Sequence, residues 1–313
     1  MSARFHAGEQ QMHERLGLGE ALSELGGRMI RDAMPDQHRD FFAQLPTMWL
    51  GTLDAQGQPW ATLLSGAPGF ARSPDAQQLR LDARPRAEDP AAQGLHPGAA
   101  VALLGLEPHT RRRNRMNGTV QALDAAGFSV RVGQSFGNCP KYIQGRRAEH
   151  VRREPGPVQT LGPSLGAEAL ALVQAADTLF IASSSSARPA GTGPQGAGVD
   201  ISHRGGRPGF VRVLREAGGD QLIVPDYAGN RFFNTLGNLL AWPRAGLLFV
   251  DWQHGHLLQL AAQAEIQHDG PELADFPGAQ RLLKLRLLQG RWRPAALPLR
   301  WSAPELAPQF LPA

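Results

Sequence analysis

The sequence predicts a mainly β (α+β) protein made of two tandem small barrels with short flanking helices. Two observations support this fold class. The chain contains two similar halves, and within each half short apolar strands separated by Gly and Pro turns outnumber the helices. Its 313 residues also suit two domains of about 150 residues, each large enough to bury its own core.

The internal repeat is visible in two pairs of segments. An extended run that ends in Pro-Gly-Phe-x-Arg occurs as WATLLSGAPGFAR at 60–72 and as DISHRGGRPGFVR at 200–212. A proline followed by an apolar strand then occurs as LHPGAAVALLGLE at 95–107 and as AWPRAGLLFVDWQ at 241–253. A duplicated domain explains these matches at similar spacing better than two unrelated domains do.

The repeat sets the expected domain boundaries. The segment RREPGPVQTLGPSLG is rich in Pro and Gly, which sustain neither a helix nor a strand ladder, so it is interpreted as a linker. We therefore expect an N-terminal helical lead at 1–34, a first barrel domain at 35–151, a linker at 152–166 and a second barrel domain at 167–313.

Each half is expected to place its elements in the same order. A short helix comes first, then a strand rich in apolar and β-branched residues, a strand that ends at Pro-Gly-Phe, another strand, a helix and a run of strands. The helix of the second half is predicted from apolar residues at helical spacing in FFNTLGNLLAW. The predicted elements are helices at 35–45, 166–177 and 232–242, and strands at 47–54, 178–183, 79–82 and 221–225.

One insertion distinguishes the halves. The second half has SSSSARPAGTGPQGAG at 183–198 where the first half has the tight turn DAQGQP at 54–59. This insertion has few apolar side chains to pack, so it is expected to be a mobile surface loop, with a lid over a site as the alternative.

Composition excludes several classes of protein. The apolar fraction is 42% and no apolar run approaches the roughly 18 residues that cross a bilayer, so no membrane association is expected. The N-terminus lacks the apolar stretch of a signal peptide, and a single cysteine cannot form an intrachain disulfide. A cytoplasmic location is therefore expected.

Charge gives a further expectation. The net charge of +4 comes almost wholly from arginine, and the arginines are scattered apart from RRRNR at 111–115. A nucleic-acid partner is not expected, because binding to a phosphate backbone favours clustered basic residues. The run at 111–115 is interpreted as a barrel strand whose arginines are exposed to solvent.

Two segments of the second half have residues suited to an anionic ligand. In SHRGGRPGFVRV (202–213), glycines leave the backbone open to a flat ligand and arginines supply fixed donors, although a bulged edge strand is an equal alternative. In PDYAGNRFFNTLGN (225–238), a helix opens next to Arg231, Asn234 and Thr235, and free N–H groups at a helix start favour phosphate. The alternative is ordinary capping by Asn230 or Asn234.

A third segment, QSFGNCPKYIQGRR (134–147), contains the single cysteine. A lone Cys is most often a small buried apolar residue, and Cys139 has neither metal-ligand spacing nor a neighbouring histidine that would activate a thiol. The ordered turn before Lys141, Tyr142 and Gln144 instead offers polar groups to a ligand. No metal site is expected, because HGH at 254–256 lies at a hairpin tip without an evident third ligand.

The segments FGNCPKYIQ, SHRGGRPGFVRV, PDYAGNRFFNTLGN and FHAGEQ together resemble the tandem, flavin-nucleotide-binding branch of the pyridoxamine 5'-phosphate oxidase-like family. The resemblance covers nearly the whole chain. It implies split β-barrels of the FMN-binding type that pair, with FMN held in the crevice between two barrels. A duplicated chain supplies both barrels from one polypeptide, and a homodimer of such chains is a further possibility.

The resemblance also implies which residues hold FMN. The second half is expected to hold the phosphate, because the first half has LDARPRAEDPAAQG, with acids in place of the Asn and Thr. Residues 138–144 of the first half are expected to close over the ring or ribityl chain. The implied FMN-binding residues are Arg204, Arg207, Pro208, Gly209, Phe210, Val211, Asn230, Arg231, Asn234 and Thr235 from the second half and Asn138, Cys139, Lys141 and Tyr142 from the first half.

The expected function is that of an FMN-binding flavoprotein with oxidoreductase activity on a small-molecule substrate or with an electron donor such as NAD(P)H. Oxidation of pyridoxamine phosphate itself is not expected, because the further arginine and histidine residues of the family's oxidase have no match here. His203 is the candidate proton donor near the ring. The alternative is a non-enzymatic carrier or sensor of flavin or heme, in which His203 would be the axial ligand.

Overall fold

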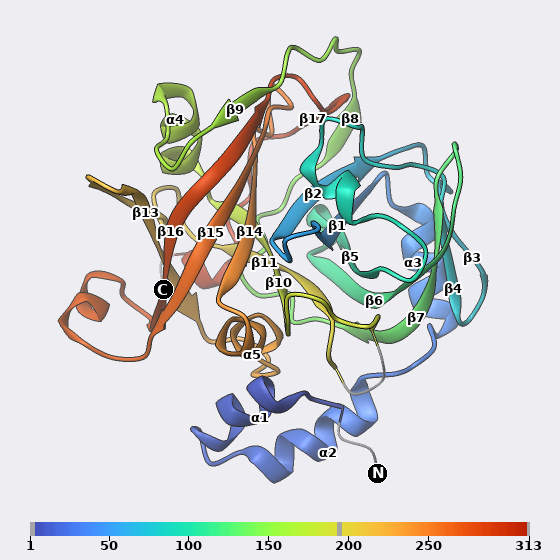
Figure 1. The fold of residues 1–313 in the computed structure, drawn as a ribbon, viewed down its shortest axis with the longest axis horizontal. Helices are drawn as coiled ribbons and strands as arrows, with labels where there is room; N and C mark the ends of the chain where they lie inside the picture. The colour runs from blue at the N-terminus through green and yellow to red at the C-terminus, as the bar shows by residue number, and fades with distance from the viewer. Residues whose placement is uncertain (1–3, 193–195, 312–313) are drawn as a thin grey trace.

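The computed structural model describes residues 4–192 and 196–311 and contains two β-sheets with the same strand order (Figure 1). The sheet of the first half has the order β2-β1-β5-β6-β7-β4-β3, and that of the second half has the order β11-β10-β14-β15-β16-β13-β12. Each strand of the first sheet therefore has a counterpart in the second. The predicted fold class, two tandem split barrels with short helices, is confirmed.

The first half begins with helices α1 (Ala7–Glu14), α2 (Gly19–Met29) and α3 (Asp36–Gln44). Its sheet consists of antiparallel pairs, so hairpins connect most neighbouring strands. The remaining elements are β1 (Thr47–Leu53), β2 (Pro59–Ser65), β3 (Ala71–Asp75), β4 (Gln78–Leu81), the 3-10 helix η1 (Pro90–Gly94), β5 (Ala100–Glu107), η2 (Pro108–Thr110), β6 (Arg112–Leu123) and β7 (Phe128–Gly137).

The second half repeats this order with one longer helix, α5, where the first half has η1. Its elements are α4 (Ala167–Ala175), β10 (Thr178–Ser184), β11 (Val199–Gly205), β12 (Arg212–Glu216), β13 (Gly219–Tyr227), α5 (Asn234–Ala241), β14 (Arg244–Val250), β15 (Leu257–Gln267), η3 (Pro271–Asp275) and β16 (Ala279–Arg293). The helices and strands predicted from the sequence agree closely with these bounds and differ from them only at their ends.

The expected linker is partly ordered into strand. Within 152–166, β9 (Gln159–Leu161) pairs with β16 of the second sheet. Just before the linker, β8 (Ala148–His150) pairs with β17 (Leu299–Trp301), and η4 (Pro308–Phe310) lies near the C-terminus. The end of the chain thus returns to the end of the first half and pairs with it.

Part of the predicted mobile loop, residues 193–195, lies outside the described residues. The flanking described part rests on the first barrel, because the N–H of Thr192 donates to Oγ1 of Thr119 at 3.1 Å and Thr192 is buried. None of the helices in residues 4–192 and 196–311 is long and apolar enough to cross a membrane.

Each barrel encloses its own apolar core, and a third core lies between the barrels. In this shared core the indole of Trp49 on β1 stacks on the ring of Phe180 on β10, with centroids 4.6 Å apart. Both side chains are fully buried. The close approach extends to the backbone, since a Cβ on Gly246 of β14 would lie 2.3 Å from the carbonyl oxygen of Pro59 on β2. The barrels therefore form one packed unit.

Helix α1 lies against α5 of the second barrel although it precedes the first barrel (Figure 1). Helix α1 packs on α5 at two glycines: a Cβ on Gly8 would lie 2.2 Å from the carbonyl oxygen of Gly237, and one on Gly237 would lie 2.5 Å from the backbone nitrogen of Glu9. Only glycine permits this distance between the helices. As a result, the side chain of Glu9 reaches the start of α5.

The shared core predicts the effect of truncating one of its rings. Replacing Phe180 by Ala should lower the free energy of unfolding by about 3–5 kcal/mol, because it removes the stacked partner of Trp49 and leaves a cavity between the barrels. Urea denaturation followed by tryptophan fluorescence measures the change. The control is Leu214→Ala on β12. Because Leu214 is exposed, this change should alter the free energy of unfolding by no more than about 0.5 kcal/mol. Equal losses in the two variants would contradict a packed interface.

Candidate functional site

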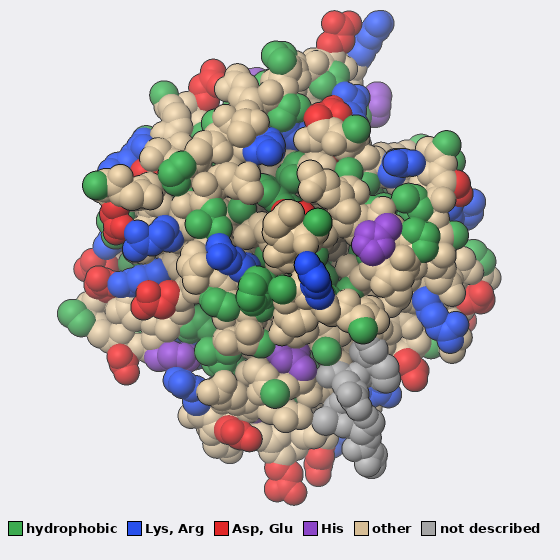
Figure 2. Space-filling view, viewed as in Figure 1, with side chains coloured by type: hydrophobic (Ala, Val, Ile, Leu, Met, Phe, Trp, Pro, Cys, Tyr) green, Lys and Arg blue, Asp and Glu red, His purple; other side chains and the backbone are tan. Residues whose placement is uncertain are grey.

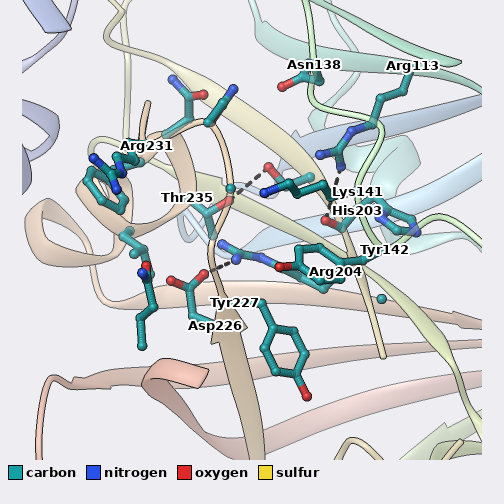
Figure 3. Close-up of a pocket in the computed structure, with 18 of the residues that line it drawn as sticks. Arg113, Asn138, Lys141, Tyr142, His203, Arg204, Asp226, Tyr227, Arg231 and Thr235 are labelled. Atoms are coloured by element: carbon teal, nitrogen blue, oxygen red, sulfur yellow. Dashed lines mark hydrogen bonds and ion pairs between the residues drawn. The ribbon is translucent and has the colours of Figure 1, made fainter. Parts of the chain in front are cut away.

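A cavity of about 100 Å³ lies at the junction of the two barrels. Its walls come from β6 and the segment after β7 in the first half, and from β11, β13, β16 and the start of α5 in the second half (Figure 3). It is lined by Arg113, Arg115, Asn138, Lys141, Tyr142, Ser202, His203, Arg204, Gly205, Pro225, Asp226, Tyr227, Gly229, Asn230, Arg231, Phe233, Asn234, Thr235, Leu236 and Gln280.

The charge of the lining is strongly positive. Of the described residues that line the cavity, five have cationic side chains and one is an acid. The cations are Arg113, Arg115, Lys141, Arg204 and Arg231, and the acid is Asp226. On the outer face drawn in Figure 2, by contrast, basic and acidic side chains are interspersed. The concentration of fixed cations at the barrel junction suits an anionic ligand, and above all phosphate or carboxylate oxygens.

The segment between β13 and α5 forms the wall opposite the first half. Arg231 and Phe233 have left-handed backbone conformations, with φ of 61° and 59°, as does Tyr142 across the cavity with φ of 67°. Such conformations cost energy in residues other than glycine and cluster at ligand sites. Strained backbone positions from both halves therefore border the same space.

Helix α5 starts at the cavity, and no side chain within the described residues caps it. The amide oxygen of Asn230 accepts from the N–H of Phe232, and the side chain of Asn234 bonds Glu9 and Arg115. Ordinary capping by either asparagine is therefore not what the structure shows. The free N–H groups and the helix dipole at this end favour an anion.

Arg204 on β11 enters the cavity and pairs with Asp226 on β13 (Figure 3). Asp226 is shared, because Arg281 on β16 also lies 3.3 Å from it. The Nε atom of Arg204 is buried and has no hydrogen-bond partner among the described residues. A buried donor without a partner costs free energy, so Arg204 retains capacity for a further acceptor.

The first half contributes two largely buried arginines that sequence reasoning placed in solvent. Arg113 donates from Nε to the carbonyl oxygen of Cys139 at 2.7 Å and from NH1 to that of His203 at 3.4 Å. Arg115 is 3% exposed. The interpretation of 111–115 as solvent-exposed arginines is therefore wrong for these two residues. They alternate along β6, so they share the face that meets the second barrel, whereas Arg112 on the other face is exposed.

Arg115 connects the two halves through a buried polar network. Its guanidinium donates to Oδ1 of Asn234 at 2.8 Å and to Oγ of Ser202 at 2.6 Å, and it lies 2.8 Å from Oδ1 of Asp200. Thr235 donates to the same Ser202 oxygen at 3.0 Å. Burial lowers the pKa of Arg115, and the Asp200 carboxylate opposes that shift. The network fixes the start of α5 relative to β6.

Two of these cations repel each other. Burial, and then the charge of Arg115, lower the pKa of Arg113 from its usual value to about 9. Arg113 still carries its charge at neutral pH. An anionic ligand in the cavity would relieve this repulsion, which favours binding.

Residues of the turn after β7 lie at the edge of the cavity. The hydroxyl of Tyr142 donates to the carbonyl oxygen of Ala228 at 3.0 Å, and its ring lies 5.3 Å from that of Tyr227. Burial raises the pKa of Tyr142. Lys141 is exposed, and the side-chain nitrogen of Asn138 is buried without a partner among the described residues. The first half thus provides donors on the side opposite α5.

His203 lies at the inner end of the cavity. Its ring meets that of Phe180 edge to face, with the two ring centroids 5.7 Å apart. Burial, and then the charges of Arg113, Arg204 and Arg146, hold the pKa of His203 well below 6.5. The imidazole is therefore neutral at physiological pH. It can donate or accept one hydrogen bond, but it does not supply the proton of an imidazolium.

The structure brings together most, but not all, of the residues singled out from the sequence. Residues placed in the cavity lining are His203, Arg204, Asn230, Arg231, Asn234, Thr235, Asn138, Lys141 and Tyr142. Residues placed outside it are Cys139, Arg207, Pro208, Gly209, Phe210 and Val211. Arg207 instead donates to the backbone oxygen of Phe310, and Phe210 and Val211 belong to the core of the second barrel.

Sequence reasoning missed Arg113, Arg115, Ser202, Asp226 and Tyr227, which also line the cavity. The alternation of Arg111, Arg113 and Arg115 along one strand face was the available signal. It did not say which face of the strand is buried, because that depends on where the second barrel packs.

A cluster of possible metal ligands lies elsewhere, at the tip of the β14–β15 hairpin, and contains Asp251, His254 and His256. His254 lies 3.0 Å from Asp251. However, Nδ1 of His256 accepts the N–H of Ala295 at 2.8 Å, so in the neutral ring the proton is on Nε2. Neither nitrogen of His256 then has a free lone pair for a metal ion while this bond persists. Asp251 is the third ligand that the sequence did not reveal, and the bond between His256 and Ala295 would have to break before the cluster could hold a metal ion.

Comparison with known proteins gives one family match. Residues 34–156 match the family model described as pyridoxamine 5'-phosphate oxidase. This segment covers the first barrel and the two arginines of β6. No curated protein matches the chain.

Three solved structures show a partial and distant likeness. The HupZ protein of Group A Streptococcus is 12% identical over 39% of this chain and 89% of its own, with a TM-score of 0.29. HutZ of Vibrio cholerae, described as a heme storage protein, is 14% identical over 46% and 97%, with a TM-score of 0.24. A protein of Mesorhizobium loti described as FAD-binding is 12% identical over 44% and 96%, with a TM-score of 0.25. Scores this low do not establish a common fold by themselves.

Glu9 gives the site a pH dependence that can be measured. The carboxyl is 1% exposed, accepts from Nδ2 of Asn234 and from the N–H of His6, and burial raises its pKa to about 8. An acid whose folded pKa exceeds its unfolded value of 4.5 lowers stability as pH rises between those values. We expect Glu9→Gln to gain stability over the wild type progressively from pH 5 to pH 8, by roughly 1.4 kcal/mol per pKa unit at most.

Thermal unfolding at several pH values measures this difference. The matched control is Glu14→Gln, an exposed carboxyl on the same helix, whose difference from the wild type should not change with pH. A Glu9→Gln profile parallel to that of the wild type would show that Glu9 is ionised in the folded protein.

Proposed function

We propose that this chain binds a flavin nucleotide, FMN, in the cavity between its two barrels, since residues 34–156 match the family model described as pyridoxamine 5'-phosphate oxidase. The observation that carries the proposal is the composition of the cavity: five cationic side chains from both halves of the described structure converge on one space beside an uncapped helix start. A flavin nucleotide offers a phosphate for the cations and a flat ring for the aromatic and glycine surfaces.

The residues present fit such a group. Arg231 and Thr235 lie at the start of α5, where N–H groups and a fixed cation suit the phosphate. The open donors of Arg204 and Asn138 suit the carbonyl oxygens and nitrogens of the ring or the ribityl hydroxyls. Gly205 allows the turn after β7 to approach β11 closely, because a Cβ there would lie 2.0 Å from the carbonyl oxygen of Tyr142.

The size of the cavity sets one requirement. Its volume of about 100 Å³ is below the roughly 300–1,000 Å³ of small-molecule sites. Arg204 and Lys141 have long side chains with several rotamers, so they are the groups that must move to admit the ring. Arg204 would leave Asp226, and Arg281 would keep that acid paired.

A bound flavin would supply the electron or hydride transfer, and the chain would supply binding and electrostatics. Positive charge from Arg204, Arg113 and Lys141 favours negative charge on the ring. His203 is neutral, so its role is to hold a hydrogen bond at the inner end of the cavity. The proposed activity is oxidation or reduction of a small molecule, with NAD(P)H as the candidate electron donor.

Identification of the bound chromophore tests the proposal most directly. The purified chain should be yellow, and denaturation should release a compound with the mass of FMN. A Soret band in place of the flavin spectrum would support the alternative of a heme carrier, with His203 as its axial ligand. Bleaching by NADH or NADPH and recovery in air would support an enzyme, whereas a flavin that resists reduction would support a carrier.

Substitutions at the helix start test where the phosphate binds. Arg231→Ala combined with Thr235→Val should weaken FMN binding at least tenfold, because one arginine–phosphate hydrogen bond contributes about 1.5–3 kcal/mol. Riboflavin, which lacks the phosphate, should lose much less affinity in the same variant. Fluorescence quenching titrations measure both ligands.

A second pair of variants separates the cavity from its surroundings. Arg204→Ala should weaken FMN binding, and Arg207→Ala should leave it unchanged, because Arg207 bonds the C-terminal segment outside the cavity. Both residues belong to the same glycine-arginine segment, so the comparison controls for its folding. Equal effects would place the ligand elsewhere.

A further inference from the structure

The equivalence of the two barrels implies a second site, related to the first by the internal repeat. Registers in the sheets fix the correspondence. Leu50 pairs with Thr62 and Leu103, and its counterpart Ile181 pairs with Ser202 and Leu247. Thr62 therefore occupies in the first half the position that Ser202 occupies at the cavity.

The other side of the cavity has a counterpart as well. Met116 pairs with Leu103 and Ser135, and Leu260 pairs with Leu247 and Gly290. Arg115 immediately precedes Met116, and Gln259 immediately precedes Leu260, so Arg115 and Gln259 are equivalent. Counting three residues beyond Ser135 and Gly290 gives Asn138 and Arg293. Gln259 and Arg293 are thus the second-half counterparts of the cavity residues Arg115 and Asn138.

Thr62, Gln259 and Arg293 all bond one side chain of the protein, that of Asp89. Asp89 lies just before η1, the element that takes the place of α5, and it is 1% exposed. Its carboxylate receives four hydrogen bonds: from Oγ1 of Thr62 at 2.5 Å, from the N–H of Ala91 at 2.9 Å, from Nε2 of Gln259 at 2.9 Å and from NH1 of Arg293 at 2.6 Å.

The charge of Asp89 is neutralised by Arg293, and the space around it is filled by apolar side chains. Asp200, which pairs with the cavity residue Arg115, corresponds to Trp60 here, and Trp60 packs in a buried cluster with Ala91 and Ala261. His203 and Arg204 correspond to Leu63 and Leu64. These polar groups of the cavity thus have apolar counterparts, and the guanidinium that is buried here, that of Arg293, is already paired.

We propose that the repeat-related position is an anion site closed by the chain's own Asp89 carboxylate, and that the protein therefore binds one phosphate-bearing ligand per chain. The stoichiometry rests on the proposed function, whereas the closed anion site does not. Arg293 belongs to the second half and Asp89 to the first, so the same contact also fastens the barrels together. At the open cavity the halves are instead joined by Arg115, which bonds Asp200 and Asn234.

Titration of the apo chain with FMN tests the stoichiometry. Flavin fluorescence at protein concentrations far above the dissociation constant should break at one FMN per chain. A break at two would overturn the proposal. Absence of any flavin binding would refute the proposed function instead, and the closed site would then be decided by the variants.

Removing the carboxylate tests the closed site without a flavin. Asp89→Ala leaves the buried guanidinium of Arg293 unpaired beside a space of carboxylate size, so sodium formate should raise the unfolding temperature of this variant more than equimolar sodium chloride does. The wild type gives the baseline response to formate. The control Asp89→Ala/Arg293→Leu, which lacks the cation, should return to that baseline.

A formate response of Asp89→Ala equal to that of the wild type and of the double variant would overturn the anion site. If Asp89→Ala does not fold, the refolding yield in formate against chloride gives the same comparison, with the same control. Recovery of the fold by formate only where Arg293 is present would support the proposal, and recovery independent of Arg293 would overturn it.

Discussion

The apolar contact between the two barrels is the constraint on which the cavity depends. Its walls come from strands of different halves, so their relative position is only as fixed as the core formed around Trp49 and Phe180. That core is fully buried and close-packed, and it leaves no freedom for one barrel to slide on the other. Duplication within one chain adds a further advantage, because the partner barrel is always present.

The cavity carries a cost that the surrounding network offsets. Arg113 and Arg115 are taken out of water beside each other, which by itself destabilises the fold. Asp200, Asn234 and the backbone oxygens of Cys139 and His203 accept from these two arginines, and Nε of Arg115 has no partner among the described residues. The open donors of Arg204 and Asn138 border the ligand space. This division between satisfied and open donors is typical of sites prepared for a charged ligand.

The two halves share a strand order but not a chemistry. At one junction, glycine, arginine and an uncapped helix surround an open space, and at the repeat-related junction, Asp89, Trp60 and leucines fill it. The N-terminal helix reinforces this difference, because it docks through Gly8 on α5, the helix that opens at the cavity. Equal backbones thus support one open and one closed site.

The sequence by itself determined the strands, the repeat and the segments that line the second-half wall, because these follow from local periodicity, turn residues and the composition of short segments. It did not determine register between distant segments. Comparison of the sequences pairs Leu103 with Phe249, whereas the sheets pair its position with Leu247. The sequence likewise did not predict the burial and the partners of Arg113, Arg115 and Asp89, since these depend on the packing of one barrel against the other. Only the tertiary structure decides such contacts, because they join residues from opposite halves of the chain.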